Sequence, residues 1–167
     1  MPFTIWDPYS NPLPYYSSIG KLFQQNVPGA LVDAQDAYAI HPYNIIVLNQ
    51  LGNVYKKMGQ MEKALEYYQL AIGISNLFES ARLSVAEIYL QQNKPVDALE
   101  ALALVRRSSR NQKYLQLLSQ ALPLTVQTYA EHQRFGPLVR YLRQRKPRSR
   151  QEYVQYFLEF RLTESNG

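Results

Sequence analysis

An interval of 34 residues recurs along this chain and constrains its fold more than any other feature. Small apolar residues recur at this interval in two series. The first is Ala30, Ala64 and Ala98, and the second is Ala37, Ala71 and Val105. A period of this length is typical of helix–turn–helix repeats. One such helix pair cannot bury its apolar face alone, so successive pairs stack and create a curved inner face. The sequence therefore predicts an all-α solenoid of antiparallel helix pairs.

The segment 45–78 carries the repeat pattern most fully. Its small side chains at Gly52 and Ala64 let two paired helices approach closely. Gly59 suits the turn between the helices because glycine accepts a positive φ. The segment resembles the tetratricopeptide family at six positions: Leu51, Gly52, Tyr55, Ala64, Tyr68 and Ala71.

The flanking segments keep parts of the same pattern. Residues 79–112 place Pro95 at the start of a second helix, where proline is tolerated. The preceding unit keeps a second helix that begins near Pro28 and ends near His41. The expected domain organisation is a Pro-rich extended lead-in (1–13), repeat units within 14–112 (about 11–44, 45–78 and 79–112), and a basic, divergent C-terminal helical cap (113–167).

The family resemblance implies a peptide-binding groove lined by the first helix of each pair. Asn49, Asn53 and Lys56 share one helical face, and their side chains can hydrogen-bond a peptide backbone or a carboxylate. The alternative is an ordinary solvated helix face. The candidate groove residues are Asn49, Gln50, Asn53, Lys56, Lys57, Ser84 and Glu87.

Positive charge is concentrated toward the C-terminal end. Between Arg106 and Arg150 the chain has eleven basic residues and one acid, within a total net charge of +5. Clustered Lys and Arg side chains attract anions, so this region is a candidate contact for a lipid headgroup or a glycan. Specific nucleic-acid binding is not expected, because Tyr141 alone offers a stacking surface; a solvated charged turn is the alternative. The candidate residues, called the basic cluster below, are Arg140, Arg143, Arg145, Lys146, Arg148 and Arg150.

The sequence gives little support for catalysis. It has no cysteine, and its two histidines, His41 and His132, fall in different helix pairs without a metal-site or nucleophile motif. We therefore expect no enzymatic activity, no cofactor and no metal.

Near the C-terminus an aromatic stripe predicts a helix that caps the core and is also a candidate homodimer contact. It consists of Tyr153, Tyr156, Phe157 and Phe160.

A narrower resemblance concerns residues 5–110. Three segments are similar to the repeat segment of bacterial O-antigen ligase and polymerase-like membrane proteins: NPLPYYSS, AIHPYNIIVLNQLGNVY and ALEYYQLAIGISNLFESARLSVAEIYL. This resemblance implies an excised scaffold domain on the periplasmic side. The alternatives are a free-standing cytoplasmic adaptor or secretion chaperone, or a nucleic-acid-associated repeat protein. The chain as given shows no signal-peptide pattern and no long apolar run, so we expect it to be soluble.

Overall fold

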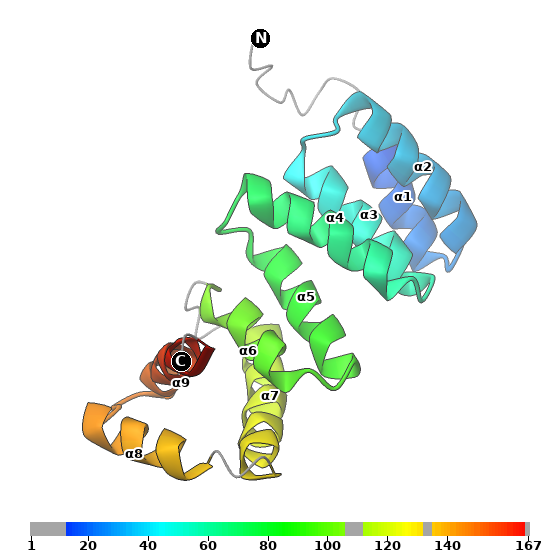
Figure 1. Ribbon diagram of the computed structural model, residues 1–167. Coiled ribbons are helices and arrows are strands. Elements are labelled where there is room, and N and C mark those ends of the chain that lie inside the picture. Colours follow the sequence, from blue (N-terminus) through cyan, green and yellow to red (C-terminus); the bar gives the residue numbers. More distant parts are fainter. Residues whose placement is uncertain (1–12, 106–111, 132–134, 166–167) are drawn as a thin grey trace. The chain divides into compact units, whose positions relative to one another are not determined.

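The computed structural model describes residues 13–105, 112–131 and 135–165, and every regular element in these ranges is an α-helix (Figure 1). This confirms the predicted all-α fold of helix pairs. The chain forms two compact units, the first ending at Ala81 and the second beginning at Arg82. Their boundary lies inside helix α5 (Glu79–Gln91). Within the described ranges, no helix combines the length and the apolar character needed to cross a membrane.

The first unit contains four complete helices: α1 (Leu13–Phe23), α2 (Val27–Ile40), α3 (Ile45–Lys57) and α4 (Met61–Ile74). Each helix contacts the next, and α1 also contacts α3 (Figure 1). The connections are only a few residues long, so neighbouring helices run antiparallel.

Helix ends in this unit follow local chemistry that the sequence shows. The Asn44 side chain caps α3 by accepting a hydrogen bond from the Ile46 backbone N–H at 2.9 Å. His41 is the C-cap of α2, which confirms its interpretation as a helix-end residue. Gly59, between α3 and α4, has a φ of 76°, which confirms the predicted left-handed turn position.

The repeated small residues form the core of each helix pair. Ala30, Ala64 and Ala98 are fully buried. At Gly52 the approach of α4 is closer still, because an added Cβ would lie 2.5 Å from Cε1 of Tyr68. The Tyr68 ring is fully buried and therefore fills the space that glycine leaves.

The second unit contains the greater part of α5, followed by α6 (Pro95–Ala103), α7 (Gln112–Glu131), α8 (Phe135–Arg145) and α9 (Arg150–Ser165). Pro95 begins α6, as the sequence predicted. Helix α7 contacts α6 and α8, and α9 contacts the same two helices. The C-terminal helices thus form one packed group with α6.

Two of the four residues in the aromatic stripe of α9 belong to the core. Phe157 and Phe160 are buried, and the Phe157 ring meets the Tyr129 ring of α7 edge to face, with centroids 5.0 Å apart. Tyr153 differs, because 48% of its surface is exposed. The two phenylalanines therefore fill the interior of the second unit, whereas Tyr156 is half-buried and Tyr153 lies at the surface.

Gly52→Ala tests the close approach of α3 and α4. The new methyl group would overlap the Tyr68 ring, and overpacking of this kind costs about 1–3 kcal/mol. Gly73→Ala is the matched control, because Gly73 is exposed on α4 and its added Cβ meets no atom within 4 Å. There the gain in helix propensity, up to about 1 kcal/mol, should raise stability. Urea unfolding followed by circular dichroism checks both; equal stabilisation of the two variants would contradict the packing argument.

Candidate functional site

A groove lies between α5 and α7 within the second unit and has a volume of about 690 Å³. We call it the α5–α7 groove. Its lining combines three leucines, four glutamines and one pair of opposite charges. Helix α5 contributes Glu87, Leu90 and Gln91, and α7 contributes Gln112, Lys113, Gln116, Leu117, Gln120 and Leu124.

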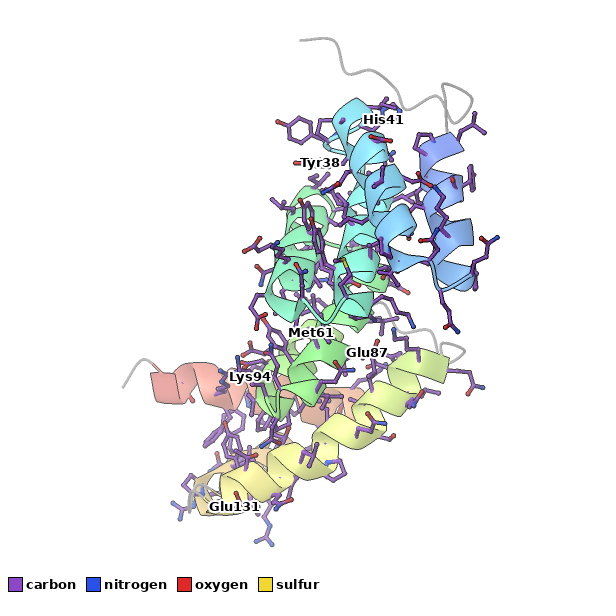
Figure 2. The ribbon with its side chains drawn as sticks, turned by 90° about the vertical axis from the view of Figure 1, so that its right-hand side faces the viewer. Tyr38, His41, Met61, Glu87, Lys94 and Glu131 are labelled. Atoms are coloured by element: carbon purple, nitrogen blue, oxygen red, sulfur yellow. The ribbon has the colours of Figure 1, made fainter. Side chains whose placement is uncertain are left out.

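The two charged side chains of the groove neutralise each other. Lys113 Nζ lies 2.7 Å from Glu87 Oε2. Figure 2 shows Glu87 on α5, next to the first turn of α7. Both side chains are partly exposed, so the ion pair contributes at most about 1 kcal/mol to stability. The pair also leaves the described lining of the groove without net charge.

A row of glutamines follows α7 along the groove. Gln112, Gln116 and Gln120 are spaced four residues apart, so they lie on one side of the helix and about 6 Å apart along its axis. All three are exposed, and none makes a side-chain hydrogen bond to another described residue. We call them the glutamine row. Leu117 and Leu124 lie beside the row, seven residues apart on α7.

Of the groove residues predicted on α3, Gln50 has a structural role. It is buried, and its Nε2 donates to Ser18 Oγ of α1 at 3.0 Å. Ser18 in turn donates to the backbone oxygen of Ala30 in α2 at 2.8 Å. This chain of hydrogen bonds joins three helices inside the first unit, so Gln50 is not available to a ligand.

The other predicted α3 residues lie at or near the surface. The Asn53 carboxamide oxygen accepts a hydrogen bond from the buried Tyr68 hydroxyl at 2.8 Å. Asn49 is half-buried, and its Oδ1 accepts no hydrogen bond from a described residue. Lys57 is exposed, and Lys56 is half-buried. Part of this polar face therefore serves packing between α3 and α4.

In the second unit the structure separates the two predicted groove residues. Ser84 is buried, whereas Glu87 lines the α5–α7 groove. The opposite wall was missed from sequence because the 34-residue register is lost after Gln112. A signal was nevertheless present, namely glutamines at four-residue intervals along one helix.

Within the basic cluster, Arg145 has several partners inside the protein. Its guanidinium lies over the Tyr141 and Tyr156 rings, 5.3 and 5.7 Å from their centroids. It also lies 3.9 Å from Glu159 Oε2. These contacts, which combine cation–π attraction with an ion pair, tie α8 to α9.

The remaining residues of the basic cluster are exposed wherever their side chains are described. Four of them, Arg140, Arg143, Lys146 and Arg148, are exposed. The Arg150 side chain and His132 lie outside the described residues. Ser149 accepts a hydrogen bond from the Glu152 backbone N–H at 3.2 Å, so it caps the N-terminus of α9.

Comparison with known proteins supports one family. Residues 45–75 match the family model described as "Tetratricopeptide repeat". The match covers α3 and α4, and the presence of this repeat suggests a protein-interaction scaffold. No curated protein matches the chain. These findings do not support the narrower resemblance to O-antigen ligases.

Ser18→Ala tests the structural role of Gln50. The change leaves the Gln50 amide and the Ala30 carbonyl without their partner, at an expected cost of about 1–3 kcal/mol in unfolding free energy. Adding Gln50→Leu should recover part of this loss, because both polar partners are then replaced by apolar groups. Chemical denaturation measures both variants, with Ser80→Ala, an exposed helical serine, as the control. A loss of stability no greater than that of the control would contradict the structural role of the Gln50–Ser18 hydrogen bond.

Proposed function

We propose that this protein is a non-catalytic scaffold that binds an extended peptide segment of a partner protein in the α5–α7 groove. The observation that carries the proposal is the glutamine row, which runs beside leucines in a groove whose described lining has no net charge. The match of residues 45–75 to a repeat family typical of protein interaction supports the same class of function.

The chemistry of the glutamine row fits a peptide main chain. Each carboxamide both donates and accepts hydrogen bonds, as each peptide unit does. In an extended chain, residues on one side repeat every two positions, about 6.6–6.8 Å apart. The four-residue helical spacing of the row is about 6 Å, and the flexible glutamine side chains can absorb the small difference. Gln112, Gln116 and Gln120 could therefore pair with alternate residues of one peptide.

The leucines of the groove supply affinity from burial. Leu124 is 38% exposed and Leu90 is half-buried, so a ligand side chain could cover apolar surface on both walls. Fully burying one aliphatic side chain of the peptide contributes about 1.5–3 kcal/mol. Because the Glu87–Lys113 pair is internally balanced, the ligand that fits best has an uncharged apolar side chain at this point.

The α3 face of the first unit is proposed as a second, smaller contact. Asn49 supports it, because its Oδ1 accepts no hydrogen bond from a described residue, and a rotation of this half-buried side chain would bring the oxygen to a ligand donor. Lys56 and Lys57 complete this contact, whereas the Asn53 oxygen is already bonded to the Tyr68 hydroxyl. Gln50 and Ser84 are left out because both are buried.

Selection from a random peptide library, followed by fluorescence polarisation with the selected peptide, tests the main groove. The double variant Gln116→Ala, Gln120→Ala should weaken binding about tenfold, since it removes two hydrogen-bonding groups. Leu124→Ala should weaken binding through lost apolar contact. The matched control is Gln35→Ala, Gln69→Ala, which removes two exposed glutamines from helices of the first unit. Equal affinity of the groove variant and the control would contradict the proposal.

A further inference from the structure

Helix α8 carries a second hollow with a chemistry unlike that of the groove. Its volume is about 540 Å³, and it is lined by Gly136, Val139, Arg140, Arg143 and Gln144. Among the described residues of this lining both charged side chains are cationic, and none is a carboxylate. We call it the α8 hollow.

The two arginines of the hollow differ from Arg145 on the same helix. Neither Arg140 nor Arg143 forms an ion pair or a side-chain hydrogen bond with another described residue. Arg145, by contrast, is held by Glu159 and two tyrosine rings. Arg140 and Arg143 are three residues apart on one exposed helix face, where like charges repel each other. An anion between them would relieve this repulsion.

The donors of the hollow suit a phosphate group. A guanidinium presents a planar fork of N–H groups that binds two phosphate oxygens at once. Gln144 adds a carboxamide N–H to the lining. The second unit as a whole has 14 basic and 7 acidic residues, so its net charge of +7 attracts anions to this surface.

Gly136 contributes to the hollow a position without a side chain. A Cβ at this position would meet no atom within 4 Å, so the space next to the Gly136 backbone is open. Gly136 precedes Arg140 by one turn and Arg143 by two, and all three line the hollow. A side chain at position 136 would occupy space that an anion could otherwise take.

We propose that the α8 hollow binds the phosphate group of a small soluble phosphate ester through Arg140 and Arg143. Insertion into a membrane is not favoured, because residues 136–145 expose no large apolar side chain. A nucleic acid is not favoured either, because Tyr141 is half-buried beneath Arg145 and provides no open stacking surface. The site is independent of the peptide groove and adds a second kind of ligand to the scaffold.

Nuclear magnetic resonance of the arginine Nε–Hε groups, with glycerol 3-phosphate as the probe and ionic strength held constant, tests the site. Saturable shifts are expected for Arg140 and Arg143. The variant Arg140→Gln, Arg143→Gln should weaken binding about tenfold or more, since it removes two charged donors. Arg148→Gln is the matched control, because it removes an exposed basic residue of the same cluster outside the hollow.

Gly136→Leu separates the shape of the hollow from its charge. It fills the space without changing a charge, so it should weaken binding of glycerol 3-phosphate while circular dichroism shows a folded chain. Equal losses in the Arg148→Gln control, or full binding in Gly136→Leu, would overturn the site. Capture by phosphatidic acid vesicles or by an oligonucleotide, without shifts from glycerol 3-phosphate, would overturn the assignment to a soluble ester. Peptide binding in the α5–α7 groove should be unchanged in all these variants.

Discussion

The contact between Gly52 and the Tyr68 ring is the constraint on which the first unit depends. Helix α4 can approach α3 this closely only because Gly52 has no side chain. The ring that fills the space carries a hydroxyl, and a buried hydroxyl needs a hydrogen-bond partner. Asn53 supplies it, one residue after the glycine that permits the approach. The close packing of α3 against α4 therefore gives Asn53 a structural role, although its position on α3 alone suggests a ligand contact.

The same reasoning explains why the two units offer different surfaces. In the first unit, the buried Ser18–Gln50 link and the Tyr68–Asn53 bond use polar side chains of α3 to join helices. In the second unit, the glutamine row on α7 does not join helices through hydrogen bonds between described side chains. Helix α7 packs instead through buried apolar residues such as Leu117, Leu118 and Ala121. Exposed carboxamides without internal partners are the groups that a ligand can recruit at least cost.

The sequence was sufficient for the features that follow from local geometry. The alanine series, Gly59 and Pro95 each have a direct conformational or steric reason, and the structure confirms all of them. Helical periodicity gives the face on which a residue lies, but it does not give its depth. Gln50 is buried because Ser18, 32 residues earlier, can satisfy it, and no local pattern reveals that partner. The α7 wall of the groove was missed for a similar reason, since prediction followed the repeat register and the register ends there.

A neutral groove and a cationic hollow can coexist on one basic unit because exposed charges act over short distances. At physiological ionic strength the field of an exposed charge decays over about 8 Å. The net charge of the unit therefore influences how anions approach, whereas the groups that line each hollow decide what stays bound. In the α5–α7 groove the Glu87–Lys113 pair removes the preference for charge, and hydrogen bonding with apolar burial remains. In the α8 hollow no carboxylate of the described lining balances Arg140 and Arg143, so the recognition proposed there depends on the charge of the ligand.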